Sequence, residues 1–223
     1  MKVILKKTPL YESFDFDSDE DFNFDEVIES HHYKKFLEEN YDIKGIIRPY
    51  KKDGMLFIDV DGNVIVKNKK LVSLTNGKFR FGTVKGNFDC HYCDSLKTLK
   101  GAPEVVGRNF ECDECKSLIS LKGAPNEVGG GFYCKNCASL TTLEGAPNEV
   151  GGGFDCNYCE SLISLEGAPS KVGGSFDCSN CNSLIFLKGA PEKVGRNFYC
   201  GYCYSLKSID LPTTTTIKGK IYR

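Results

Sequence analysis

Residues 88–109 read FDCHYCDSLKTLKGAPEVVGRN, and residues 110–131 read FECDECKSLISLKGAPNEVGGG. The second stretch repeats the first after 22 residues, so that Phe88 aligns with Phe110 and Cys90 aligns with Cys112. The template F-x-C-x-x-C-x-S-L-x-x-L-x-G-A-P-x-x-V-G-x-x recurs in full at Phe132, Phe154 and Phe176, and its first half recurs at Phe198, where Ile209 replaces the second Leu. Self-similarity at a fixed period is the signature of a repeat architecture. The sequence therefore predicts a solenoid of six coils.

The template also predicts the path of each coil. The Phe and the first Cys are two residues apart, so they share one face of an extended segment. The Gly-Ala-Pro triplet and the Val-Gly pair interrupt regular structure on the return path. Each coil thus contributes one short strand and a mostly irregular return. Stacking places Phe on Phe and Leu on Leu, in a parallel sheet with strands about 4.8 Å apart.

The block Phe-x-Cys-x-x-Cys-x-Ser-Leu-x-x-Leu resembles the leucine-rich repeat signature, with one extra residue between Cys and Leu. It is most similar to the short cysteine-bearing repeats of bacteria and phages. The resemblance covers about residues 60–210. It implies a recognition scaffold, and it implies that the second Cys of each repeat takes the place of an Asn that satisfies backbone groups.

Four regions follow from the pattern: an acidic, aromatic segment at 1–30, a small α/β cap at 31–86, the repeats at 87–208, and a C-terminal cap at 209–223 with one last strand as an option. Within the N-terminal cap, the sequence predicts an amphipathic helix over residues 25–40. Val64 begins a degenerate coil in which Val66 and Lys69 occupy the two cysteine positions.

In the acidic segment, residues 11–29, phenylalanines alternate with carboxylates. Two interpretations remain open. The segment is either disordered until it folds on a partner, or it packs on its own cap. The second interpretation draws on charge, because residues 41–86 carry ten Lys or Arg against four Asp or Glu.

Composition excludes several function classes. The chain of 223 residues has a formal net charge of −1, which gives no reason to expect nucleic acid as a partner. No apolar run approaches the about 20 residues of a membrane-spanning helix. We therefore expect a cytoplasmic protein, in the host cytoplasm if it is encoded by a phage. No catalytic constellation stands out, so we expect neither an enzyme nor a cofactor.

The twelve cysteines allow three interpretations. The spacing of Cys90, Cys93, Cys112 and Cys115 falls within the range used by zinc ribbons. A redox-responsive thiol is a second possibility. A buried thiol ladder is the interpretation that the sequence favours, because the first Cys shares a face with Phe and free Cys is among the most buried residue types.

The residues that flank the inward Phe and Cys are expected to face outward on the concave sheet. This face is net negative and carries tyrosines, so it suits a basic protein patch. The predicted partner-binding residues are Asp89, His91, Glu111, Asp113, Tyr133, Lys135, Asp155, Asp177 and Tyr199.

The sequence thus favours a protein-binding module, for example a phage-encoded modulator of a host protein. The alternatives are a component of a larger assembly such as a virion, and a zinc or redox protein. Ile119, Ile163, Ile185 and Phe186 are expected to pack within their coils. Exposed together, they would mark a contact surface, so the expected state is a monomer or a weak homodimer.

Overall fold

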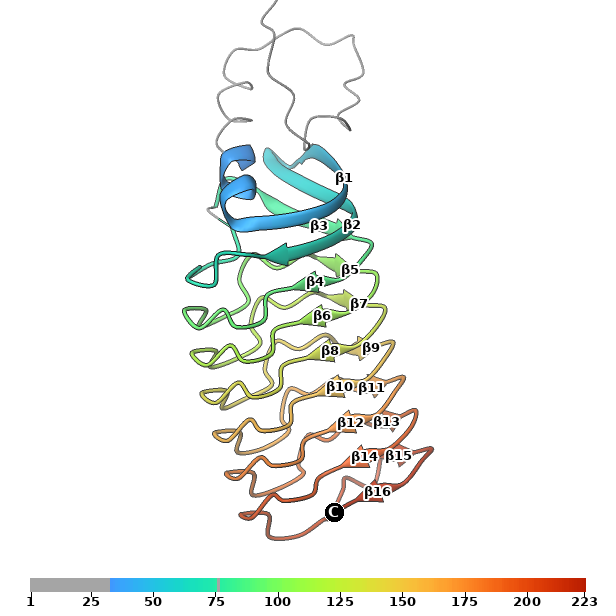
Figure 1. The fold of residues 1–223 in the computed structure, drawn as a ribbon. Coiled ribbons are helices and arrows are strands. Elements are labelled where there is room, and N and C mark those ends of the chain that lie inside the picture. Colours follow the sequence, from blue (N-terminus) through green and yellow to red (C-terminus); the bar gives the residue numbers. More distant parts are fainter. Residues whose placement is uncertain (1–32, 76) are drawn as a thin grey trace, which may run out of the picture.

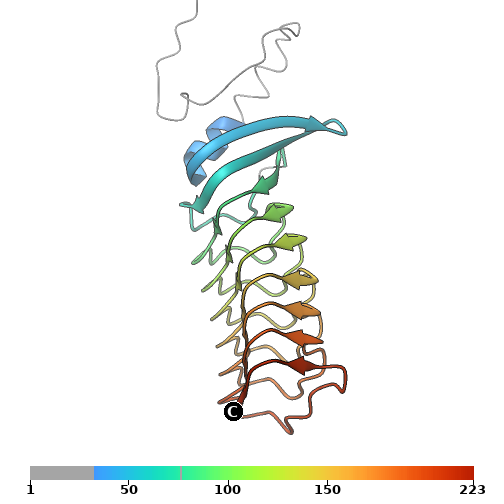
Figure 2. The same cartoon turned by 90° about the vertical axis from the view of Figure 1, so that its right-hand side faces the viewer.

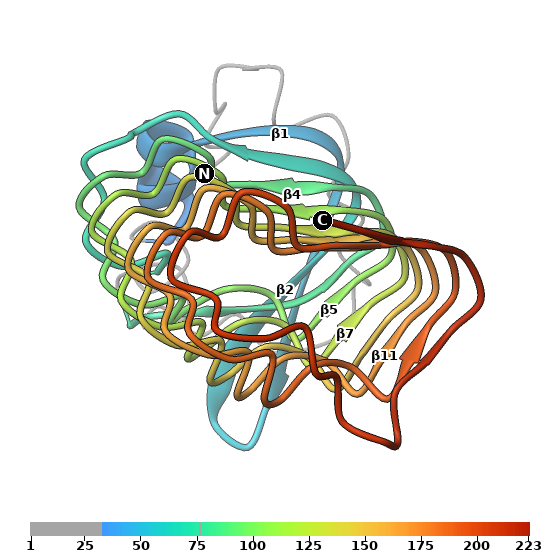
Figure 3. The same cartoon turned by 90° about the horizontal axis from the view of Figure 1, so that it is seen from below.

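The computed structural model describes residues 33–75 and 77–223, and these residues form a parallel β-solenoid (Figure 1). Equivalent strands of successive coils hydrogen-bond to one another, with Phe110 in register with Phe88 on one side and with Phe132 on the other. Seen along the stack, the coils overlay closely (Figure 3). The repeat solenoid that the sequence predicts is therefore confirmed.

Each coil contributes two short strands, where the sequence predicted one. The first ladder, called the Phe ladder here, begins at each repeat's Phe. Its strands are β4 (Phe88–Asp89), β6 (Phe110–Glu111), β8 (Phe132–Tyr133), β10 (Phe154–Asp155), β12 (Phe176–Asp177), β14 (Phe198–Tyr199) and β16 (Ile221–Tyr222). The sequence did not predict the second ladder. All of its strands except the first are only two residues long, and the strands of the repeats lie between Pro and Gly.

The second ladder, called the Val ladder, carries the Val that precedes each repeat's Gly. Its strands are β3 (Arg80–Val84), β5 (Val105–Val106), β7 (Glu127–Val128), β9 (Glu149–Val150), β11 (Lys171–Val172), β13 (Lys193–Val194) and β15 (Thr216–Ile217). In each two-residue strand of the repeats, the Val is buried and the residue before it is at least partly exposed. This alternation is that of a sheet with one face in the core.

Both ladders start from one strand. β2 (Met55–Val66) pairs with β3 through Phe57, Ile58 and Val60, and it pairs with β4 through Val64 and Ile65. Val64 is in register with Phe88, and Val66 is buried where later coils have their first Cys, so the predicted degenerate coil is confirmed. β2 therefore provides the first rung of both ladders.

The N-terminal end of the stack is covered by β1 (Tyr41–Lys52), which forms an antiparallel hairpin with β2 (Figure 2). Asp53 and Gly54 connect the two strands, with φ of 51° and 72°, as a tight hairpin turn requires. A helix at residues 33–40 precedes β1. The remainder of the helix predicted over residues 25–40 lies outside the described residues.

The core consists of rows of like residues that run through the stack. The Phe rings of neighbouring repeats lie nearly parallel, with centroids 5.1 to 5.6 Å apart. The glycines of the Val-Gly pair also form a row. A Cβ on Gly151 would lie 2.1 Å from the carbonyl oxygen of Gly129, so the backbones of adjacent coils touch there. Close stacking depends on both rows.

The last coil is less well covered than the inner ones. Residues 209–223 add two strands, β15 and β16, where one was expected as an option. Ile221 and Tyr222 are 42% and 44% exposed, whereas Phe198 in the preceding coil is fully buried. Lys193 and Phe198 of the preceding coil pair with Thr216 and Ile221, so both ladders continue into this coil.

Candidate functional site: the carboxylate–tyrosine face

Six of the nine predicted site residues form one row on the Phe ladder. The residue after each repeat's Phe is in register with its counterparts in the neighbouring coils. The row, called the carboxylate–tyrosine row here, consists of Asp89, Glu111, Tyr133, Asp155, Asp177 and Tyr199. All six side chains are partly exposed, while the Phe and Cys on either side of each are buried. The structure thus brings these residues together as the sequence predicted.

The other three predicted residues lie in a parallel row two positions further along each strand. Asp113 and His91 are partly exposed and Lys135 is exposed. The Asp113 carboxylate accepts a hydrogen bond of 2.8 Å from the Lys135 backbone N–H. The His91 ring contacts the Asp89 carboxylate, which also accepts the His91 backbone N–H at 3.0 Å. The two rows therefore form one surface.

The aspartates of the first row also support the backbone. Asp155 accepts the Asn157 N–H at 3.0 Å, and Asp177 accepts the Ser179 N–H at 2.8 Å. Each of these bonds uses one carboxylate oxygen, namely Oδ1. An ionised carboxylate has about four acceptor positions. Such a carboxylate keeps the capacity to accept further donors from a ligand.

Electrostatic repulsion and desolvation act together on this face. Burial, with a contribution from the adjacent Asp177, raises the pKa of Asp155 to about 6, although the hydrogen bond from the Asn157 backbone lowers it. Burial also raises the pKa of Glu111, with Asp89 and Asp113 adding to the shift. The pKa of Asp113 is raised, mainly by burial. Like charges directly opposite each other destabilise a sheet, so this arrangement has a cost that a cationic ligand would remove.

Tyrosines border the carboxylates at the turn between the two cysteines. Tyr92, Tyr158 and Tyr202 have φ values of 58°, 56° and 57°. This left-handed conformation is unfavourable for a bulky residue. The three rings are 53%, 50% and 68% exposed, so burial in the core does not account for them. They supply flat aromatic surface beside the second row.

Sequence reasoning missed the role of one row. Asn87 and Asn109 were expected on the outward face, and they are partly exposed there, but their side chains also connect the coils. Asn87 Oδ1 accepts the Asn109 N–H at 3.0 Å, and Asn109 Oδ1 accepts the Gly131 N–H at 2.9 Å. Asn63 begins the same column by accepting the Asn87 N–H at 2.8 Å. The recurrence of Asn at this position was the available signal.

The cysteines form two buried columns of free thiols, and all twelve lie in the described residues. The second Cys of a repeat donates to the carbonyl of the first Cys in the preceding coil, as Cys115 does to Cys90 at 3.2 Å and Cys137 does to Cys112 at 3.2 Å. This is the backbone-satisfying role that the resemblance implied for the second Cys.

The same geometry bears on the zinc and redox interpretations. Burial raises the pKa of Cys93 to about 12, and a hydrogen bond with Cys115 together with burial raises the pKa of Cys90. Metal binding and nucleophilic attack both require the thiolate. Within residues 33–75 and 77–223, no group of three or more His, Cys, Asp and Glu side chains is arranged to hold a metal ion.

An apolar strip lies on the Leu-x-x-Leu side of the stack. Ile119 and Ile163 are 49% and 51% exposed, and Phe186 is 49% exposed. The expectation that these side chains pack within their coils was therefore wrong. The two leucines of each repeat already fill the interior, so Ile119 and Ile163, each directly after the first leucine, and Phe186, directly before the second, are left exposed. Ile185 is partly exposed.

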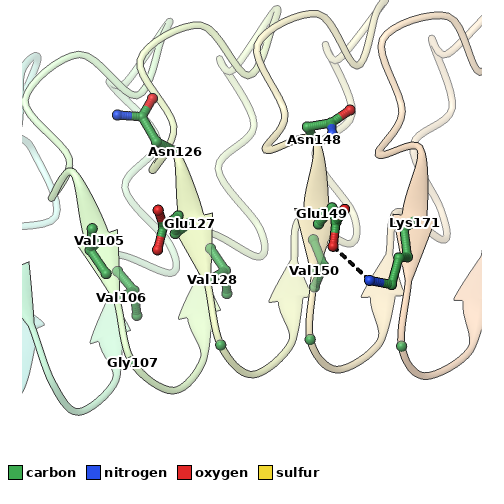
Figure 4. A pocket seen from close by; sticks show the side chains of 13 residues that line it. Val105, Val106, Gly107, Asn126, Glu127, Val128, Asn148, Glu149, Val150 and Lys171 are labelled. Carbon is green, nitrogen blue, oxygen red and sulfur yellow. Dashed lines mark hydrogen bonds and ion pairs between the residues drawn. The ribbon is translucent and has the colours of Figure 1, made fainter.

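A hollow of about 710 Å³ runs along the Val ladder (Figure 4). The glycines after each Val form its lower edge, and Glu127 and Glu149 stand on its strands. Lys171 donates to Glu149 across adjacent coils at 2.8 Å. Sequence reasoning did not identify this hollow, because it arises from the second ladder.

None of the described helices is long and apolar enough to cross a membrane. Searches against protein-family models, curated proteins and solved structures found no match to this chain. The leucine-rich repeat family therefore stays a prediction from the repeat template, while the solenoid fold is established by the coordinates.

Proposed function

We propose that this protein is a non-enzymatic binding module that holds a basic segment of a protein partner on the carboxylate–tyrosine face. One observation carries the proposal: partly buried carboxylates stand in register on one ladder, with Asp89 beside Glu111 and Asp155 beside Asp177. Lys or Arg side chains of a partner would relieve the repulsion and gain hydrogen bonds. Tyr133 and Tyr199 in the same row supply aromatic anchors.

The test is a selection of random 12-residue peptides displayed on a surface against the intact protein. We expect the enriched peptides to carry an excess of Lys and Arg. The variant with Asp89→Lys, Glu111→Lys and Asp155→Lys should lose at least tenfold in affinity for these peptides.

The matched control changes three carboxylates elsewhere in the array, as Glu127→Lys, Glu160→Lys and Glu192→Lys, with the same change in net charge. It should keep the affinity within about twofold, because long-range effects of surface charge are screened by salt. Equal losses in both variants, or enriched peptides without cationic excess, would contradict the proposal. Circular dichroism of both variants checks that the solenoid stays folded.

A second candidate function is a role in a larger assembly, which one observation favours. Ile221 and Tyr222 of the last coil are 42% and 44% exposed, and uncovered apolar ends favour stacking of solenoids. Sedimentation velocity over a hundredfold range of concentration tests this function. A sedimentation coefficient that stays constant and equals that of a monomer would exclude stacking under those conditions.

A further inference from the structure

β1 is the outermost strand at the N-terminal end of the sheet. It pairs with β2 along all of its 12 residues, and in the described part of the chain no strand pairs with its other edge. In an antiparallel pair, alternate residues direct their N–H and C=O groups away from the partner strand. Such an edge is a template for another strand. This is the longest open edge of the described sheet.

The two faces of β1 differ in chemistry. Tyr41 and Ile47 are buried against the cap. The opposite face is exposed and carries three cations, Lys44, Arg48 and Lys52, against one carboxylate, Asp42. Ile46 and Tyr50 lie between the cations at 41% and 39% exposure. Lys44 contacts Asp42 at 3.7 Å and Arg48 contacts Asp61 at 3.3 Å, and all four side chains stay at least 38% exposed. A strand that covers this edge must therefore present apolar side chains on one face and anionic side chains on the other.

The chain contains one segment with this pattern, outside the described residues. Residues 14–25 read FDFDSDEDFNFD. Every odd position is Asp or Asn, and four of the six even positions are Phe. The segment carries six carboxylates and no Lys or Arg. A period of two is the pattern of a strand with one apolar and one polar face.

We propose that residues 14–25 of the same chain pair with the outer edge of β1 as an antiparallel strand. Asp and Asn side chains then lie on the face of Lys44, Arg48 and Lys52, and the phenylalanines lie on the face of Tyr41 and Ile47. One register therefore places the carboxylates beside the cations of β1 and also places the phenylalanines beside its apolar residues. At most one hydrogen bond along the outer edge is lost, because Pro49 is the only residue of β1 without an N–H.

Chain length permits this pairing within one molecule. The helix at residues 33–40 separates the segment from β1 by about 12 Å, at 1.5 Å per residue. Residues 26–32 precede the helix and can span about 23 Å when extended. The segment and β1 have 12 residues each, and the 15 residues between them allow the end of the segment to lie beside the start of β1, which makes the pair antiparallel. The proposal selects self-packing over folding on a partner, and it does not depend on the proposed function.

Residue-resolved amide exchange of the intact chain by NMR tests the pairing. We expect slow exchange at the β1 amides that point away from β2, and at alternate amides of residues 14–25. The Ser18→Pro, Glu20→Pro variant removes two N–H groups of the segment that point to β1 and should accelerate exchange of those β1 amides at least tenfold. The matched Ser18→Ala, Glu20→Ala variant should keep most of the protection. Equal exchange in wild type and the proline variant overturns the proposal.

Two further measurements keep the test decisive. Protection that falls on dilution assigns the covering segment to a second copy and overturns the intramolecular pairing. The Lys44→Glu, Lys52→Glu variant should lose protection, and Asp17→Lys with Asp25→Lys in the same chain should restore it, because each pair of positions is eight residues apart. Absence of restoration overturns the charge match. Exchange in the Phe ladder, which lies apart from this edge, reports whether each variant is folded.

Discussion

The two sides of the Phe ladder follow different rules. On the inward side, the residue is Phe in each of the six repeats and is fully buried. On the outward side, the residue of the carboxylate–tyrosine row differs from coil to coil. Carboxylates lie next to one another there, and the pKa values of Glu111 and Asp155 are raised. The inward row is explained by stability alone. The outward row opposes stability, and this difference is the reason for proposing it as the binding side.

The inward row should show the largest effect. Phe132→Ala in a central coil should lower the free energy of unfolding by about 3–5 kcal/mol, because it leaves a cavity between two stacked rings. Tyr133→Ala, one residue away on the outward side, should cost less than about 1 kcal/mol. Urea unfolding followed by circular dichroism measures both. Similar losses at the two positions would remove the distinction between the two sides.

Substitutions in the glycine row test whether the stability of the solenoid depends on close backbone contact as strongly as it depends on the Phe row. Gly151→Ala should cost about 2–3 kcal/mol, since its Cβ would lie 2.1 Å from the Gly129 carbonyl oxygen. Gly54→Ala in the hairpin turn is the control. Its Cβ would meet no atom within 4 Å, although its φ is 72°, so only about 1 kcal/mol is expected. Thermal unfolding that ranks the two variants in the opposite order would contradict this account.

The outward carboxylates should respond to pH. The pKa of Asp155 is raised from 3.8 to about 6 in the folded protein. Between these values the folded state binds more protons than the unfolded state, so the stability from this group is present at low pH and is lost as pH rises through 6. Asp155→Asn should therefore be more stable than wild type by about 1 kcal/mol at pH 7.5, after allowance for solvent screening. This advantage should vanish near pH 4.

The substitution keeps an acceptor for the Asn157 N–H, which lies 3.0 Å from Asp155 Oδ1. Asp94→Asn serves as the control, because Asp94 also accepts a backbone N–H, from Lys116 at 3.3 Å, but lies outside the row. Urea unfolding at the two pH values measures the effect. A stability gain that is the same at pH 4 and pH 7.5 would rule out ionisation as its cause.

The smallest effect is expected at the turns beside the face. Tyr158→Gly should raise the free energy of unfolding by about 0.5 kcal/mol, because relief of the left-handed conformation exceeds the entropy that Gly loses on folding. Asn180→Gly at the equivalent turn, where φ is 59°, should change little, since Asn tolerates this conformation. If Tyr158→Gly also weakens binding of the selected peptides, the tyrosine belongs to the binding surface. A loss of stability would show that the Tyr158 ring makes stabilising contacts even though half of its surface is exposed.

The repeat template was sufficient to predict the solenoid, the Phe row and the position of Val64, because six copies average out local ambiguity. It was also sufficient to place Asp89, Glu111 and Asp155 on one row, since a strand alternates its faces. It did not predict the second ladder, because two-residue strands next to Gly and Pro leave no periodic signal. It wrongly placed Ile119 and Ile163 in the core, because a hydrophobic side chain does not by itself indicate whether the core still has space for it.

β2 gives both ladders a common starting edge, and this has a consequence for biosynthesis. A ribosome releases the chain from its N-terminus, so the edge is complete before the first repeat emerges. Each later coil then needs to close a loop of only about 22 residues, an entropic requirement that stays the same for every coil added. Growth therefore has a direction, from β2 toward the last coil.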